Sequence, residues 1–452
     1  MNIFNHSYKE LGTAQNLLAY ARACCQLPGM VLLESRKGAD DSRYDILAAR
    51  PKAMLKLDDF GGDLSQWMLA IEAALDGGQS CAKSGAIAIG FVDYDSAAQM
   101  AIHPQQSLDM LGTPGVAGKS SATCGIYDWC LKRDRIDGTV TLHCSPQLSE
   151  EERQVIDKQI SMVEHQPLTF SLSSRFQHHT SREQYLRDIA SIRDYIGAGD
   201  CYQVNYAQRF SAAFSGEPLA AYEVLRNIAP GDFSALLALR PNQAVLSLSP
   251  ERFLSVSGGC VITQPIKGTR PRHPDPKIDQ TIARELQKSL KDCAENVMIT
   301  DLLRNDLGRL CVPGSVTTTE LCQLYSYENV HHLVSKIEGK LQPGVSAGQL
   351  LVGCSPGGSI TGAPKRRAME IIAELEQHPR GVYCGSVFAL DASGRLESSI
   401  AIRTLEVIDE HIHCWGGGGI TFDSDAESEY QETFDKVGAF LKALEMTSHA
   451  LD

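Results

Sequence analysis

The sequence predicts an α+β fold. Strand patterns and helix patterns follow one another along the 452 residues without strict β-α-β alternation, which argues against a doubly wound parallel sheet. No repeat with a period of roughly 20 to 50 residues is visible, and this excludes solenoids and propellers. Hydrophobic residues make up 43% of the chain and charged residues 21%. These are ordinary values for a globular protein that can bury a large core.

The part of the chain up to about residue 170 mixes strands with a helix. Apolar runs predict strands at 29–34 and 85–94. Strict alternation of polar and apolar residues predicts another at 139–143. Residues 149–165 have helical periodicity, and their acidic first turn complements the helix dipole.

A boundary is predicted at residues 171–180, which are polar, rich in Ser and His, and without a clear period. Directly after it, Thr180 and Glu183 have the spacing of a capping box that opens a helix. The elements predicted beyond it are that helix, ending near residue 196, a long helical stretch at 275–308, strands at 398–404 and 412–415, and a last helix at 428–446.

Charge and cysteine usage narrow the class of function. A formal net charge of -13 repels polyanions, so a general nucleic-acid binder is not expected. A small anionic substrate stays possible because a pocket can be locally basic. The 14 cysteines form no C-x-x-C pair and no zinc spacing with His, which is typical of reduced thiols in the cytoplasm. No apolar run approaches the length of a membrane span, and no signal peptide is recognised at the start.

Polar and glycine-rich segments concentrate in the C-terminal two thirds of the chain. Each segment alone is a weak signal, because glycine clusters are usually turns. The set comprises residues 201–205, 249–253, 265–269, 294–296, 304–309, 330–335, 356–365, 402–404, 416–420 and 429–436.

Two of these segments suggest anion and metal binding. Four glycines, 416–419, follow an apolar strand. They either expose backbone N–H groups to a carboxylate or form a tight turn into the last helix. Glu429, Glu432 and Lys436 share one face of that helix. They either help to bind Mg²⁺, with Glu295 as a third carboxylate, or form a solvated ion-pair face.

Lys267 is the candidate nucleophile. It lies between an apolar residue and a glycine, a setting that lowers the pKa of an amine. The alternative is a lysine that extends from a turn into solvent. The adjacent His331 and His332 precede an alternating strand, and the pattern does not show which of the two faces the interior.

Taken together, the segments resemble the chorismate-utilising enzymes. The ordered set covers about residues 180–438, and the N-terminal part matches through 32–35 and 42–45. The resemblance implies a large two-lobed sandwich of mostly antiparallel sheets with helices packed outside, like anthranilate synthase component I. It divides the chain into an N-terminal region, 1–170, and a chorismate-binding catalytic region, 180–438.

Within the family, residues 265–269, Pro-Ile-Lys-Gly-Thr, are most similar to the aminodeoxychorismate synthase component I type. Anthranilate and isochorismate synthases carry Ala where Lys267 stands. The resemblance implies conversion of chorismate and ammonia to 4-amino-4-deoxychorismate, for 4-aminobenzoate and folate biosynthesis. No glutaminase signature is evident, so ammonia is expected from a separate glutamine amidotransferase subunit. The alternatives are anthranilate synthase component I and a non-catalytic relative that binds tryptophan or a partner.

The resemblance also assigns roles to single residues. Glu251 is expected to be the general acid and base, Lys267 to attack C2 of chorismate, and His332 to lie beside the departing hydroxyl. The ring carboxylate and its Mg²⁺ are expected at the three glutamates named above. The substrate carboxylates are expected at Thr361, Tyr383, Arg403, Gly417, Gly418, Gly419 and Lys436.

Some relatives of this type bind tryptophan in the N-terminal part. The residues that match are Ser35, Ser42, Arg43, Tyr44, Phe233 and Ser234. The match departs from the pattern because two residues are inserted after Pro230, between it and Phe233. That insertion puts a tryptophan site in doubt.

Overall fold

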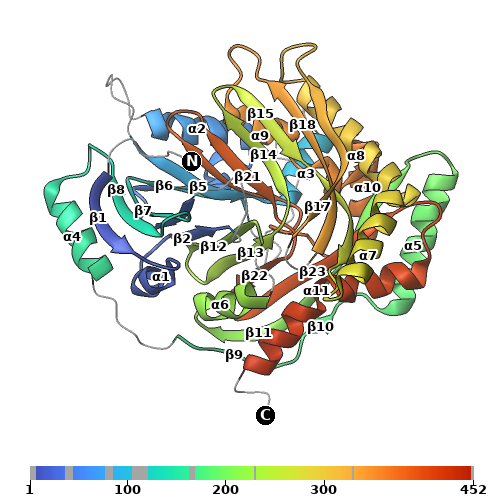
Figure 1. The fold of residues 1–452 in the computed structure, drawn as a ribbon, viewed down its shortest axis with the longest axis horizontal. Coiled ribbons are helices and arrows are strands. Elements are labelled where there is room, and N and C mark those ends of the chain that lie inside the picture. The colour runs from blue at the N-terminus through green and yellow to red at the C-terminus, as the bar shows by residue number, and fades with distance from the viewer. Residues whose placement is uncertain are drawn as a thin grey trace.

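The computed structural model describes residues 7–35, 44–76, 85–103, 121–161, 168–228, 231–327 and 330–448. Two large β-sheets form its centre, and helices surround them (Figure 1). The pairings between strands are antiparallel. Within these described ranges, no helix is both long and apolar enough to cross a bilayer.

The larger sheet has 13 strands. In spatial order its main path runs through β1 (Ser7–Thr13), β8 (Thr139–Cys144), β7 (Trp129–Asp134), β3 (Tyr44–Ala48), β2 (Met30–Glu34), β12 (Phe233–Arg240), β13 (Gln243–Ser249), β22 (Thr404–Ile408), β23 (His411–Ile420), β11 (Gln203–Gly216) and β10 (Gln177–His178), with β9 (Phe170–Leu172) and β19 (Gly362–Ala363) also on β11.

The smaller sheet has 10 strands. Its order is β16 (Ile266–Pro271), β18 (Val330–Lys340), β15 (Cys260–Gln264), β14 (Arg252–Ser257), β21 (Leu396–Ile400), β20 (Ser386–Asp391), β5 (Ile87–Val92), β6 (Thr123–Tyr127) and β4 (Ala53–Lys56), and β17 (Thr317–Ser326) pairs with β18.

The two sheets pack face to face through an apolar layer that both supply. On β12, Ala235 and Leu237 point into this layer, whereas Leu236 belongs to the core on the other face. On β20, Val387 points into the layer and Phe388 away from it. The side chains alternate along each strand, and both faces are covered. Central strands therefore carry buried apolar residues on both faces.

Helices cover the outer faces of both sheets. Helices α1 (Leu18–Cys24), α4 (Glu150–Ser161), α6 (Pro218–Ile228) and α11 (Ala426–Thr447) supply core residues to the outside of the larger sheet, and α5 (Arg182–Gly197) lies beside α11 (Figure 1). The smaller sheet is covered by α2 (Leu64–Asp76), α3 (Tyr94–Ile102), α7 (Pro276–Lys288), α8 (Leu290–Gly308) and α9 (Ala347–Cys354), with short 3₁₀ helices η1 (Leu57–Phe60) and η3 (Gly358–Ile360). Helix α10 (Lys365–Leu375) packs on β11 and β19 of the larger sheet.

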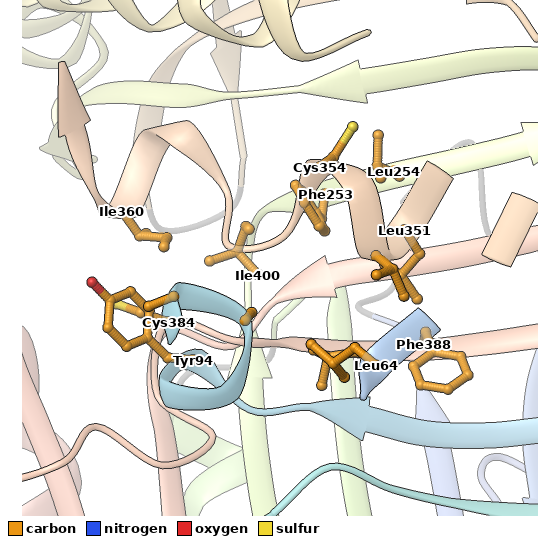
Figure 2. Packing of buried hydrophobic residues seen from close by; sticks show 14 of the residues in the cluster. Leu64, Tyr94, Phe253, Leu254, Leu351, Cys354, Ile360, Cys384, Phe388 and Ile400 are labelled. Atoms are coloured by element: carbon orange, nitrogen blue, oxygen red, sulfur yellow. The ribbon is translucent and has the colours of Figure 1, made fainter. Parts of the chain in front are cut away.

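The core under these helices is built from distant segments. Figure 2 shows Leu64 of α2, Leu351 of α9 and Phe388 of β20 close together, and all three are buried. Tyr94 and Cys384 lie together at another part of the same cluster. The cluster therefore joins the first hundred residues to the last hundred.

The predicted fold, a sandwich of antiparallel sheets with outer helices, is confirmed. Two local details differ from the sequence prediction. The N-cap of α5 is Ser181 rather than Thr180, and its side chain accepts a hydrogen bond from the N–H of Gln184. The stretch 275–308 is two helices, because Ser289 ends α7 and its side chain caps α8.

The N-terminal region 1–170 and the catalytic region 180–438 share both sheets. Strand β2 pairs with β12, and β5 pairs with β20. The position of the boundary between the two regions stays a prediction.

Candidate active site

Glu251 lies at the corner between β13 and β14 and is 5% exposed. Ser249 holds this corner, because its Oγ donates to the carbonyl of Ile400 at 2.6 Å and accepts from the N–H of Glu251 at 3.2 Å. The Oγ of Ser359 donates to Glu251 Oε1 at 2.7 Å. Burial raises the pKa of Glu251 to about 7, although Ser359 and Lys267 oppose the shift. This carboxyl can therefore give and take a proton near neutral pH.

Lys267 on β16 has the opposite shift. Loss of hydration lowers the pKa of its amine, while the carboxylates of Glu295 and Glu251 act against that shift and the charge of Lys436 adds to it. The next residue, Gly268, has φ of 83°, and a side chain there would meet Asp292 of α8. Strand β16, helix α8 and the corner between β13 and β14 thus bring the poorly hydrated amine of Lys267 near the carboxylates of Glu295 and Glu251.

His332 on β18 is 3% exposed and pairs in register with Thr269 of β16, two residues from Lys267. Its Nδ1 is 2.8 Å from Thr269 Oγ1, and its ring contacts that of Tyr327 edge-on. His331 is also buried, against Ser326 and Asp279. The alternation does not expose either histidine. Both pair in register with β16, the strand of Lys267, and His332 also hydrogen-bonds to a side chain of that strand.

The four glycines 416–419 are neither a turn nor a free loop. They are part of β23 and pair with β11. The pairing with β22 stops at Cys414, so among the described strands the other edge of the glycine run has no partner. A Cβ on Gly417 would lie 2.5 Å from the carbonyl of Tyr206. Close packing on a neighbouring strand therefore requires glycine here, and the open edge offers backbone groups to a ligand.

Helix α11 brings charged side chains to Gly418. From the position of a Cβ on that glycine, Glu429 Oε2 is 3.1 Å away, Glu432 Oε1 3.4 Å and Lys436 Nζ 3.6 Å. Lys436 donates to the carbonyl of Gly417 at 2.7 Å and forms an ion pair with Glu432 at 2.6 Å. Burial raises the pKa of Glu429, and the neighbouring Glu432 raises it further, whereas a hydrogen bond from Ser424 lowers it.

The three predicted metal ligands are only partly brought together. Across the residues that the structure describes, no group of three or more His, Cys, Asp or Glu side chains is arranged to hold a metal ion. Glu429 and Glu432 meet at Gly418, whereas Glu295 is on α8 and interacts with Glu432 electrostatically. Two carboxylates that face one glycine backbone still suit a hard cation that keeps several waters, which is how Mg²⁺ is usually bound.

Tyr383, Arg403 and Thr361 surround the same end of the larger sheet. Tyr383 is 5% exposed, and its ring stacks on Trp415 of β23 at 6.0 Å. Arg403 has φ of 50° in the connection from β21 to β22. Thr361 is buried, and its carbonyl accepts from the N–H of Asn205 on β11 at 2.8 Å.

Sequence reasoning missed the residue that ties these segments together, Arg380. This guanidinium is 1% exposed and donates to the carbonyls of Ile360 and Asn205 at 3.1 and 2.6 Å. It forms an ion pair with Glu376 at 2.6 Å. Arg380 thereby fixes the segment after Ser359 against β11. No sequence motif marked Arg380. Ser359 was also not predicted as a site residue, although it lies inside the glycine-rich segment 356–365.

Four of the six candidate tryptophan residues lie at one cavity. Ser35, Tyr44, Phe233 and Ser234 line one cavity between the two sheets, together with side chains of β20 and β21. Ser42 and Arg43 lie outside the described residues. The Oγ of Ser234 donates to the carbonyl of Gly231 and accepts from its N–H, both at 3.1 Å. The insertion after Pro230 is therefore closed by a local turn that keeps Phe233 at the cavity.

The fold and the sequence are those of a chorismate-binding enzyme. The sequence pattern of the chorismate binding enzyme family matches residues 30–442, and the chain belongs to that family. All the candidate catalytic, substrate and metal residues lie within the match.

Three individual proteins illustrate what the chain is similar to. The chain is 44% identical to "Aminodeoxychorismate synthase component 1" of Escherichia coli, over 79% of this chain and 77% of that protein. It is 42% identical to "Anthranilate synthase component 1" of Thermus thermophilus, over 62% of this chain and 60% of that one. The crystal structure of anthranilate synthase component I from Streptococcus pneumoniae superposes with a TM-score of 0.72 at 27% identity, over 90% of this chain and 94% of that chain.

Proposed function

We propose that this chain aminates chorismate at C4, as component 1 of an aminodeoxychorismate synthase. The observation that carries the proposal is Lys267, a poorly hydrated amine within Pro265–Thr269 and electrostatically coupled to the carboxyl of Glu251. The identity to relatives of that name supports it. In an anthranilate-forming relative, Ala is expected at this position.

The amine and the carboxyl divide the reaction into two easier steps. The neutral amine of Lys267 forms a bond to C2, both conjugated ring double bonds shift by one position, and the C4–O bond breaks. Glu251, protonated in part because its pKa is about 7, gives its proton to the departing hydroxyl, which leaves as water. Ammonia then bonds to C4, the double bonds shift back, and the lysine is expelled. Glu251 accepts the proton that the new amine loses.

Chorismate is a dianion, so its site needs positive charge and N–H donors. Arg403 and Tyr383 would hold the pyruvyl carboxylate. Thr361, Lys436 and the backbone of 417–419 would bind the ring carboxylate. Mg²⁺ would be held by Glu429 and Glu432, with Glu295 opposite, and when bound it would offset the negative charge of that carboxylate.

Ammonia is expected from a partner protein. The relatives bear the designation component 1, and the sequence contains no glutaminase signature. We infer a separate glutamine amidotransferase subunit, a cytoplasmic location and a role in 4-aminobenzoate and folate synthesis. A non-catalytic role is not favoured, because Glu251, Lys267 and His332 lie together with shifted or buried side chains.

Product identification tests the proposal. The purified chain is incubated with chorismate, Mg²⁺ and an ammonium salt, and the products are separated and identified by mass spectrometry. We expect 4-amino-4-deoxychorismate, with the pyruvyl group retained. Formation of anthranilate and pyruvate would instead show the anthranilate synthase reaction.

A second site is supported by the cavity between the sheets. We infer that it binds tryptophan, because Ser35, Tyr44, Phe233 and Ser234 line it although they come from two strands and one connection. Titration calorimetry with tryptophan should show one site per chain, weakened in F233A. Equal binding by F233A would place tryptophan elsewhere.

A further inference from the structure

Histidines gather on the larger sheet away from the catalytic groups. They come from three segments: the connection after β10 supplies His179, the segment after α10 supplies His378, and β23 supplies His411 and His413. The ring centroids of His179 and His378 are 5.2 Å apart, and those of His411 and His413 are 6.1 Å apart. His413 also lies 6.1 Å from the ring of Trp415.

Arg209 of β11 completes this cluster. It pairs in register with Trp415, and Ser211, two residues on, pairs with His413, so these side chains share one face of the sheet. The Oγ of Ser211 is 2.5 Å from His179 Nε2. The charge of Arg209 acts on His179, His378 and His413 alike. The four segments that meet here therefore place one guanidinium among imidazoles.

Among the described residues, the guanidinium of Arg209 has no anionic partner. Its Nε is buried, and its N–H donates to no group in the described part of the chain. Burial lowers the pKa of Arg209, and no described carboxylate opposes that shift. His413 Nδ1 is also buried without a partner in the described part of the chain. Unpaired buried polar atoms of this kind are costly, and here two of them occur in one cluster.

Two acidic residues lie near the cluster, Glu376 and Glu406. Glu376 accepts from the N–H of Ala207 on β11 and forms an ion pair with Arg380. Glu406 of β22 pairs in register with His413, and its Oε2 accepts from the N–H of Val382 at 3.1 Å. That hydrogen bond directs the carboxylate toward the turn that carries Tyr383. The groups that face the guanidinium are accordingly the imidazoles of His179, His378 and His413.

We propose that Arg209, His179, His378 and His413 form a binding site for a small free oxyanion, such as a carboxylate, sulfate or phosphate group. An oxyanion accepts several N–H bonds at once and supplies the negative charge that the cluster lacks. The site is separate from the chorismate site, and the inference does not depend on the proposed function.

The proposal has a definite pH dependence. Burial and the charge of Arg209 lower the pKa of His179 and of His413 to about 4 and that of His378 by a lesser amount. A bound anion favours the protonated imidazoles and raises these pKa values. Binding therefore takes up protons and must strengthen as pH falls.

Sulfate is the probe, because its charge is constant between pH 6 and pH 8. The midpoint of thermal unfolding of the full chain is measured at increasing sulfate concentrations, and sodium chloride is adjusted to keep the ionic strength constant. We expect a saturable rise of about 2 °C at pH 6 and less than half of it at pH 8. R209Q should lose the saturable part. R366Q, which removes an equal charge at an exposed surface position, should keep it.

Histidine ring NMR of the wild-type chain gives a second measurement that needs no variant. Sulfate should shift three ring signals with one common affinity and raise their pKa values. A linear, unsaturating stabilisation by sulfate in the wild type, or the same saturable rise in R209Q, would overturn the proposal. So would a saturable response with no change in the histidine signals.

Discussion

Glu251 and Lys267 show how burial alone prepares two side chains for opposite tasks. Loss of hydration penalises a charge of either sign, so it raises the pKa of the carboxyl and lowers that of the amine. Each shift is moderated by the other group, since the two charges attract. The result is a partly protonated acid and a partly neutral amine at the same pH. Catalysis by proton transfer and by nucleophilic attack needs those two forms.

The carboxyl of Glu251 should reduce the stability of the protein at high pH. Its pKa is about 7 in the folded chain against about 4.5 unfolded, so the folded state binds the proton more tightly. Its favourable contribution is present at low pH and is lost as pH rises through 7. E251Q keeps an acceptor for Ser359 and removes the charge. We expect E251Q to gain up to about 3 kcal/mol in free energy of unfolding over the wild type at pH 8, and little at pH 5.

Urea unfolding at the two pH values measures this difference, and chorismate turnover by E251Q should be lost. E370Q, on an exposed face of α10, is the control and should change neither property. A gain for E251Q that does not depend on pH would show that Glu251 is not the titrating group.

Lys267 should carry a covalent adduct. Incubation with chorismate and Mg²⁺ without ammonia is expected to trap the ring on its amine, and a digest analysed by mass spectrometry would locate it. K267A should slow amination at C4 by at least about tenfold, or ~1.4 kcal/mol of barrier. It should also give some C2-aminated product, because C2 is then open to ammonia. K277A, on exposed α7, is the control.

Wild-type turnover by K267A, together with no adduct on the parent chain, would rule out covalent catalysis by this lysine.

At the scale of elements, β23 and α11 make one unit of the site. The helix packs over the strand because the strand carries glycines where the helix approaches. A Cβ on Gly416 would lie 2.4 Å from the carbonyl of Thr433, which is backbone of α11. On Gly418 the nearest atoms are instead the ends of the Glu429, Glu432 and Lys436 side chains. The first glycine sets the distance between strand and helix, and the second leaves room among the charged groups.

Substitution of Gly416 should therefore affect stability, and substitution of Gly418 should affect catalysis. G416A must displace α11 and should lower the free energy of unfolding by about 1–3 kcal/mol. G418A meets only flexible side-chain ends, so its stability should change by less than about 1 kcal/mol while its KM for chorismate and its requirement for Mg²⁺ rise. Urea unfolding and steady-state kinetics on the pair separate the two effects. Equal loss of stability in both variants would contradict this account of the strand.

At the scale of the molecule, the site is assembled from nearly the whole C-terminal region. Glu251 lies between β13 and β14, Lys267 is on β16 and Glu295 on α8, whereas the glycine strand and α11 follow more than a hundred residues later. Strand pairing and the packing of the two sheets hold these elements together. Damage to the layer between the sheets should therefore affect the whole site.

The complete chain should use free ammonia but not glutamine. We expect product from chorismate with ammonium salts, rising with pH as more ammonia is neutral, and none with glutamine. Glutamine with an added commercial glutaminase is the positive control. Glutamine-dependent product from the purified chain alone would show that it contains a glutaminase after all.

The sequence by itself determined the architecture and much of the site, because local patterns carry that information. Alternation at 139–143 predicted β8, periodicity at 428–446 predicted α11, and the motif around Lys267 indicated the family and its chemistry. Tertiary structure decided what depends on distant partners. It made 416–419 a strand by pairing it with β11, and buried both His331 and His332. Tertiary structure also brought Arg380 to carbonyls from two segments and Arg209 near three histidines. Backbone pairing and loss of hydration are set by neighbours in space, and no local pattern of residues records them.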